Sequence, residues 1–322
     1  MRDIYERLKP LGFDASFVRS CILPSWWEDK LAEVPANRSY AATVIARQLG
    51  FPMSCLRDKT CELSQNSNIS TRFKCRQGTQ STDLVAAQTL GCRLAMLGSK
   101  CLSEPLKAGT LTASTIRGKI LESGAKWVGL EELLAYCWTS GIPVIHLNKR
   151  PRGKKMDGMV VLLEERPVII VASGWKQPAW HLFTIAHELG HLACGHLSTG
   201  EASVDRDLRK GPAGSIEEEG ANTFATRLLA GTTASIEPGS ARNAPQLAVA
   251  AASIGELRRI NPGFVVLSYA WKHKAWPVGS AALNELYPDA EASGIYKHFY
   301  SRLELDELVE DNRHLFDCLT EA

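Results

Sequence analysis

The sequence lacks any long hydrophobic run. No segment of its 322 residues approaches the ~18–20 consecutive apolar residues that a membrane-spanning helix requires. Its first residues, Met-Arg-Asp-Ile-Tyr-Glu-Arg-Leu-Lys, are charged and amphipathic and lack the apolar core of a secretory signal. We therefore expect a cytoplasmic protein with no membrane partner.

The sequence also lacks the cysteine spacings of common cysteine frameworks. Its nine cysteines are an odd number, and no two have the C-x-x-C spacing. These features argue against a disulfide framework and against a structural zinc ribbon. We expect most of the cysteines to be small buried thiols.

The chain as a whole has little excess of positive over negative charge, because its net charge is only +2. It is nevertheless uneven along the chain. Residues 1–120 contain 17 Lys and Arg and 10 Asp and Glu, whereas the remaining residues contain 20 Lys and Arg and 25 Asp and Glu. A basic N-terminal third is compatible with a DNA contact. An ordinary solvated surface of modest charge is the alternative, and both interpretations stay open.

The most informative stretch contains His187-Glu188-Leu-Gly-His191. Residues four apart share one face of a helix, so His187 and His191 can hold one ion together. A catalytic zinc takes three protein ligands and a water, and Glu188 is placed to accept a proton from that water. A plain amphipathic core helix is the alternative for so short a motif.

Apolar residues at helical spacing predict a second helix over residues 217–229. Glu218, near its start, is the candidate third ligand, and Asn222 lies four residues later on the same face. Asn222 is therefore expected to support the His187 ring. The glutamates on either side of Glu218 point about 100° away and rank lower. Carboxylates also favour a helix N-terminus for purely electrostatic reasons.

Three short apolar runs predict strands of a small sheet beside the zinc helix, at residues 142–146, 159–163 and 168–171. We expect the last of these to be an edge strand, where an extended substrate adds by backbone hydrogen bonding. Residues 198–215 have the polar, Gly- and Asp-rich composition of a loop.

Helical patterns precede and follow this region, and three parts are expected. Residues 1–80 form a helical N-terminal module, residues 81–240 the core, and residues 241–322 a helical C-terminal module. Within the first module, Ala46, Gly50 and Leu56 have the spacing of a helix-turn-helix. Its second helix offers little for base readout, so a partner-docking role is an equal alternative to DNA binding.

Together, Thr184-Ile-Ala-His-Glu-Leu-Gly-His191 and Glu218-x-x-Ala-Asn-x-Phe-Ala225 resemble the ImmA/IrrE zinc metallopeptidases, a gluzincin-like group. The resemblance covers roughly residues 125–235. It implies an α+β, mainly helical fold with a zincin-like core, a small mixed sheet and helical modules at both ends. It also implies Zn²⁺ held by His187, His191 and Glu218, with Glu188 as general base. One departure is Gly220, where such proteins often carry a second Glu.

The resemblance further implies a protein substrate. Family members typically cleave a helix-turn-helix repressor and so derepress an operon, in phage defence, a mobile element or a DNA-damage response. The alternative is a DNA-binding or antitoxin-like regulator whose metal site is structural or vestigial.

Two side chains raise further hypotheses about the zinc site. A loop cysteine upstream of the core could close the open zinc position, because zinc binds thiolates well. Cys101, flanked by loop residues and Lys100, is the first candidate and Cys75 the second, with an uninvolved thiol as the alternative. His196, off the metal-facing stripe, is a candidate donor to a developing oxyanion.

Overall fold

The computed structural model describes residues 1–58, 61, 63, 74–75, 84–102, 111–150, 156–163, 166–198, 201–205, 216–234, 236, 238–239 and 243–320. Its helices are α1 (Arg2–Leu8), α2 (Ala15–Phe17), α3 (Pro35–Leu49), α4 (Met53–Arg57), α5 (Val85–Lys100), α6 (Ala113–Glu122), α7 (Leu130–Thr139), α8 (Pro178–Ala193), α9 (Ile216–Ala230), α10 (Ala244–Arg258), α11 (Pro262–His273), α12 (Trp276–Leu286), α13 (Ala292–Tyr300) and α14 (Glu310–Thr320). Its strands are β1 (Lys74–Cys75), β2 (Val144–His146), β3 (Gly158–Leu163), β4 (Arg166–Val171) and β5 (Glu201–Asp205). The expected α+β, mainly helical fold is confirmed.

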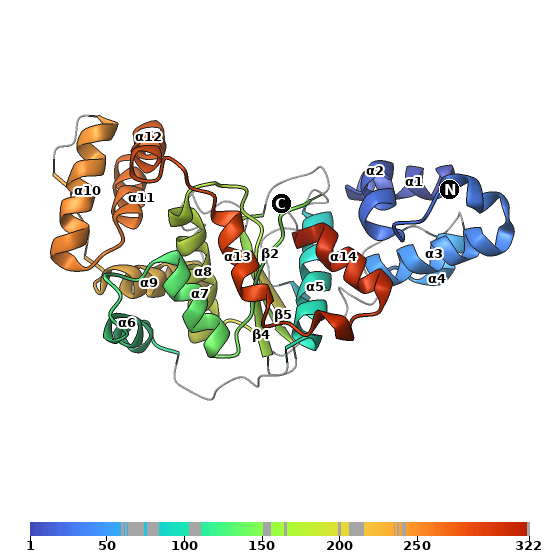
Figure 1. Cartoon of the computed structure of the whole chain (residues 1–322), viewed down its shortest axis with the longest axis horizontal. Coiled ribbons are helices and arrows are strands. Elements are labelled where there is room, and N and C mark those ends of the chain that lie inside the picture. Colours follow the sequence, from blue (N-terminus) through green and yellow to red (C-terminus); the bar gives the residue numbers. More distant parts are fainter. Residues whose placement is uncertain are drawn as a thin grey trace.

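A mixed sheet in the order β1-β5-β3-β4-β2 lies in the middle of the molecule (Figure 1). β3 runs antiparallel to both β4 and β5, while the outer pairs β2–β4 and β1–β5 are parallel. The run from Pro167 to Val171 in β4 is buried throughout, because helices cover both faces of the sheet and strands lie on both sides.

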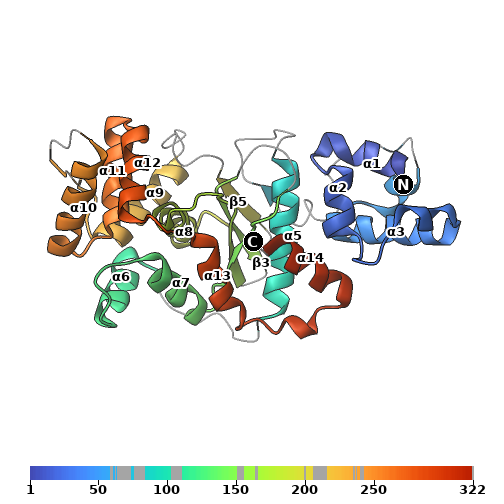
Figure 2. The same cartoon turned by 45° about the horizontal axis from the view of Figure 1, so that its top comes forward.

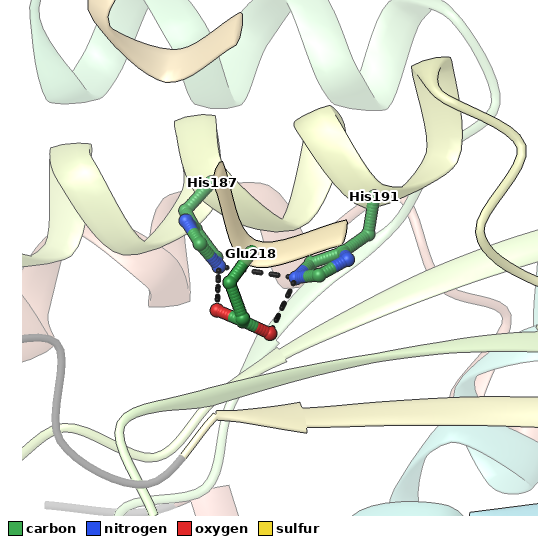
Figure 3. A group of neighbouring side chains, drawn as sticks. All are labelled: His187, His191 and Glu218. Carbon is green, nitrogen blue, oxygen red and sulfur yellow. Dashed lines mark hydrogen bonds and ion pairs between the residues drawn. The ribbon is translucent and has the colours of Figure 1, made fainter. Parts of the chain in front are cut away.

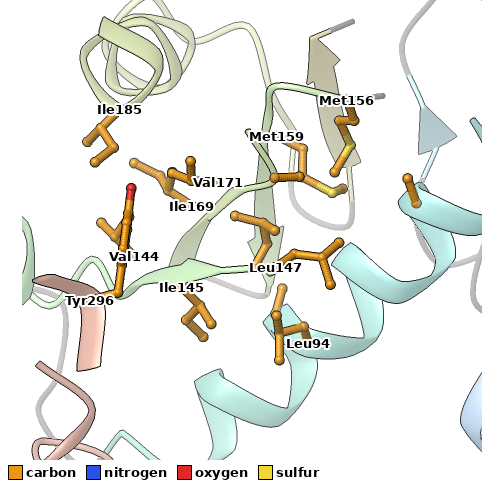
Figure 4. Close-up of a cluster of buried hydrophobic side chains, with 14 of the residues drawn as sticks. Leu94, Val144, Ile145, Leu147, Met156, Met159, Ile169, Val171, Ile185 and Tyr296 are labelled. Carbon is orange, nitrogen blue, oxygen red and sulfur yellow. The ribbon is translucent and has the colours of Figure 1, made fainter. Parts of the chain in front are cut away.

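Two helices sandwich the sheet, as Figure 4 shows. Ile185 of α8 packs on one face, and Leu94 of α5 packs on the other. Glycines let α5 approach closely, since a Cβ atom at Gly98 would overlap the Ile145 side chain. Helix α8, which carries His187 and His191, is therefore held between the sheet and the helices α7, α9 and α11.

Aromatic side chains attach the helices α11 and α12 to the start of α8, and α10 packs on these two helices. Trp180 of α8 stacks on Trp175, with ring centroids 5.1 Å apart, and meets Trp276 at 5.6 Å. Trp271 of α11 contacts Phe183 edge-on at 4.4 Å. Large aromatic faces stabilise such packing through buried area and ring geometry. These helices occupy one end of the molecule, and α1 to α4 occupy the other (Figures 1 and 2).

The C-terminal helix α14 packs on the N-terminal segment and on α5, far from the helices α10 to α12 (Figure 2). The buried guanidinium of Arg93, on α5, binds the side-chain oxygens of Gln48 and Asn312, which joins α3, α5 and α14. The end of the predicted C-terminal module, helix α14, therefore lies against both α5 and the N-terminal segment.

Disulfides are present, contrary to the expectation of free thiols. Cys21 pairs with Cys318, and Cys55 pairs with Cys61. The spacing rule failed because the first pair spans 297 residues and depends entirely on the contact between α14 and the N-terminal segment. Cys101, Cys137 and Cys194 are free thiols.

The residues with helix-turn-helix spacing lie on α3, at its C-cap and on α4. Gly50 ends α3 with φ of +71°, a left-handed conformation that glycine adopts at little cost. α4 is only five residues long. None of the described helices is both long and apolar enough to cross a membrane.

Candidate metal centre

Both histidines of the motif lie on one buried face of α8. The helix begins with Pro178 at its first turn, where a missing N–H costs nothing, and its residues from Ala179 to His191 are buried. The Nε2 atoms of His187 and His191 lie 3.0 Å apart. The local 3.6-residue period predicted this arrangement, since four residues complete just over one turn.

Glu218 of α9 completes the cluster, as Figure 3 shows. Its Oε2 lies 3.4 Å from Nε2 of His187, and its Oε1 lies 3.6 Å from Nε2 of His191. A tetrahedral zinc with ligands about 2.0–2.1 Å away holds them about 3.3 Å apart. The three side chains therefore fit the ligand set of one metal ion, and their ligand atoms all lie within 4.8 Å of one another.

Glu188, the α8 residue after His187, is fully buried, and its carboxylate lies against Gly158 at the start of β3. A Cβ atom at Gly158 would lie 2.5 Å from its Oε1 and 2.5 Å from Cγ2 of Thr184. The absence of a side chain at Gly158 thus leaves the space in which the Glu188 carboxylate lies. Neither the HExxH pattern nor any helical period predicts this role for a glycine on a strand.

The Nδ1 atoms of His187 and His191, on the side of each ring away from the cluster, both have a polar partner. Oδ1 of Asn222 lies 3.0 Å from Nδ1 of His187, the contact expected from its spacing on α9. Nδ1 of His196 lies 3.0 Å from Nδ1 of His191. His196 therefore faces the far side of the His191 ring, away from Nε2. This geometry does not support the hypothesis that it donates to an oxyanion.

Cys101 is not brought to this cluster. It follows the last residue of α5, on the sheet face opposite α8, and it is buried. Its carbonyl accepts the Glu304 backbone N–H at 2.7 Å, which fixes this turn beneath the C-terminal segment. Burial also raises the pKa of the Cys101 thiol to about 11, which disfavours the thiolate that zinc would need. The structure therefore gives no support to a zinc cap from Cys101. For Cys75, only the backbone of β1 lies within the described residues.

Two sheet predictions are wrong. The strand at 168–171 is not an edge, because β2 pairs with β4 on the side away from β3. Part of the expected loop 198–215 is β5, which pairs with β3 through Ala202 and Val161. The alternation of Ala202 and Val204 with polar residues was its only signal, and two apolar residues are too few to distinguish a strand.

A second pair of histidines, His146 of β2 and His181 of α8, is buried against Tyr296 of α13 and belongs to the packing. Nε2 of His146 lies 3.0 Å from the Ser173 carbonyl, and Nδ1 of His181 lies 2.9 Å from the Tyr296 hydroxyl. Burial lowers the pKa of His146 to about 4 and that of His181 to about 3, because the interior disfavours a charged imidazole. Both rings are therefore neutral at physiological pH.

Comparison with known proteins agrees with this centre. Residues 137–234 match the family model Peptidase_M78, described as the IrrE N-terminal-like domain. Neither the curated proteins nor the solved structures gave a match. The matched segment contains His187, His191 and Glu218. The match therefore supports membership of this chain in the ImmA/IrrE family of peptidases.

Proposed function

We propose that this chain is a zinc-dependent endopeptidase that cleaves a helix-turn-helix transcriptional repressor and thereby derepresses an operon. The observation that carries the proposal is the convergence of His187, His191 and Glu218, with the buried carboxylate of Glu188 on the adjacent helical position. The match to a peptidase family supports the reaction type. The repressor comes from the family resemblance alone.

The residues of the site divide the work of peptide hydrolysis. Zinc, when bound, acidifies a water molecule and polarises the scissile carbonyl. Glu188 accepts the proton of the attacking water and returns it to the leaving amine. His187, His191 and Glu218 hold the ion, while Asn222 keeps the His187 ring oriented through its Nδ1 atom.

The test uses the purified full-length chain and a helix-turn-helix repressor encoded beside its gene. Wild-type protein with one equivalent of Zn²⁺ is expected to cleave the repressor. Glu188→Gln is expected to keep the ion and the fold but to lose about 10²–10⁴-fold in rate, since it removes only the general base. Cleavage by Glu188→Gln at the wild-type rate would disprove the assignment of this residue.

A matched pair of variants tests the third ligand. Glu218→Ala is expected to abolish stoichiometric Zn²⁺ binding, because only two protein ligands remain. Glu219→Ala removes an exposed carboxylate from the next position of α9 and is expected to bind Zn²⁺ like the wild type. Equal zinc binding by both variants would contradict the proposed ligand set.

The second candidate is a DNA-binding or antitoxin-like regulator, favoured by the basic N-terminal third and by the turn between α3 and α4. Five residues make α4 about 7.5 Å long, which is short for a helix that reads the major groove. The two candidates differ in one result. If the repressor is never cleaved and operon control is unchanged in Glu188→Gln, the result favours the regulator over the peptidase.

A further inference from the structure

The chain reverses direction directly after the zinc-motif helix. α8 ends at Ala193, and Gly195 follows with φ of +68°. The Gly195 N–H donates to the Leu192 carbonyl at 3.1 Å, and the His196 N–H donates to the His191 carbonyl at 3.0 Å. This pair of bonds is a Schellman motif, which folds the backbone back against the last helical turn. His196 is thereby anchored to the same residue that its side chain meets.

The two rings meet edge to face. The ring centroids of His191 and His196 lie 5.1 Å apart at an interplanar angle of 66°, with 3.0 Å between their Nδ1 atoms. His191 directs its other nitrogen, Nε2, toward His187 and Glu218. One edge of the His191 ring thus serves the candidate metal position, and the opposite nitrogen meets His196.

A glycine on α9 makes room for this ring. A Cβ atom at Gly220 would lie 3.3 Å from Cε1 of His196 and 3.7 Å from Sγ of Cys194. Both distances are measured to the segment that follows α8. Gly220 is also the position at which the chain departs from the family pattern. The His196 ring lies next to the space that a side chain at this position would occupy.

We infer that His196 is a positioning residue for His191, a role that rests on the proposed zinc site. A neutral imidazole that binds a metal through Nε2 carries its proton on Nδ1. The Nδ1–H of His191 then donates to Nδ1 of His196, which accepts because its own proton is on Nε2. This bond fixes the tautomer and the rotation of the His191 ring, as Asn222 does for His187 on the other side of the cluster.

The test compares two substitutions of His196 by competition for Zn²⁺ against a chromophoric chelator, using the full-length protein. His196→Leu removes the acceptor at similar volume, and it is expected to raise the Kd for Zn²⁺ by about 10–100-fold. His196→Asn places a carbonyl oxygen near the former Nδ1 atom, and it is expected to recover most of the affinity. Thermal unfolding of the metal-free proteins serves as the control for folding.

A spectroscopic measurement adds a readout that packing alone does not produce. In the zinc-loaded wild type, ¹⁵N-resolved NMR is expected to show a protonated Nδ1 on His191, and this proton is expected to exchange with water faster in His196→Leu. Equal zinc affinity in wild type and His196→Leu would overturn the inference and leave the proposed function intact. Equal losses in the Leu and Asn variants would also overturn it. If the wild type binds no Zn²⁺, the proposed function fails together with the inference.

Discussion

The backbones of α8 and α9 approach each other closely at Gly190 and Ala221. A Cβ atom at Gly190 would lie 2.7 Å from the carbonyl oxygen of Ala221 and 2.8 Å from its Cα. This approach of one backbone to the other brings Glu218, one turn before Ala221, to the two histidines. The glycine of the HExxH motif is therefore a packing requirement of the metal centre.

Replacing this glycine tests the requirement. Gly190→Ala is expected to push the helices apart, to destabilise the fold by about 1–3 kcal/mol, and to weaken Zn²⁺ binding, because Glu218 moves with α9. Urea unfolding and chelator competition measure the two effects. Gly118→Ala is the control, since nothing lies within 4 Å of its added Cβ in helix α6. It is expected to leave zinc affinity unchanged and to stabilise the fold by up to about 1 kcal/mol.

Gly158→Ala is expected to displace the Glu188 carboxylate, because the added methyl would lie 2.5 Å from Oε1. Peptidase activity is expected to fall by more than about 10-fold, in line with the loss of a positioned general base. The ligand residues lie on α8 and α9, so Zn²⁺ affinity is expected to change much less than the rate. Gly294→Ala, with open space around its Cβ, is the matched control. Wild-type rates in Gly158→Ala would show that Glu188 needs no such space.

Acid is expected to destabilise the protein through His146 and His181. Their pKa values are about 4 and about 3 in the fold, against 6.5 for an ordinary histidine, so the unfolded chain binds more protons in this range. Their contribution to stability is complete above pH 6.5 and is lost as the pH falls toward 4. Each imidazole contributes a slope of about 1.4 kcal/mol per pH unit within this window.

The slope is measured by urea unfolding of the metal-free protein between pH 7 and pH 4.5. His146→Gln is expected to flatten it, because one buried imidazole no longer titrates. The exposed His298→Gln serves as the control and is expected to keep the wild-type slope. An unchanged slope in His146→Gln would mean that other groups dominate the acid response.

The disulfide between Cys21 and Cys318 is expected to stabilise the packing of α14 on the N-terminal segment. Loss of this cross-link between residues 297 apart is expected to lower the free energy of unfolding by about 2–5 kcal/mol. Non-reducing peptide mapping should recover the two cysteines in one linked peptide. Cys318→Ser removes this cross-link and leaves Cys55–Cys61 in place, so it should show this loss in urea unfolding without reductant. Equal stability of Cys318→Ser and the oxidised wild type would contradict the prediction.

Local periodicity by itself determined part of this protein's architecture. The spacing of His187 and His191 requires only one helical turn, so the sequence alone predicts that the two rings share a face. The strand character of β4 and the helical character of α9 follow equally from short-range apolar patterns. Glu218 was selectable among three glutamates because Asn222 lies on the same helical face.

Tertiary packing decided the rest, because each remaining feature joins segments distant in the chain. Whether a strand lies at the edge of a sheet depends on which other strands pair with it. Here β2 pairs with β4 and β5 pairs with β3, so both β4 and β3 are interior strands. The position of Cys101 depended on α5 crossing the far face of the sheet. The candidate metal centre also requires glycine at two positions. The absence of a side chain at Gly190 lets α9 approach α8, and its absence at Gly158 leaves room for the Glu188 carboxylate. No periodic pattern encodes such contacts, since they exist only when two backbones meet.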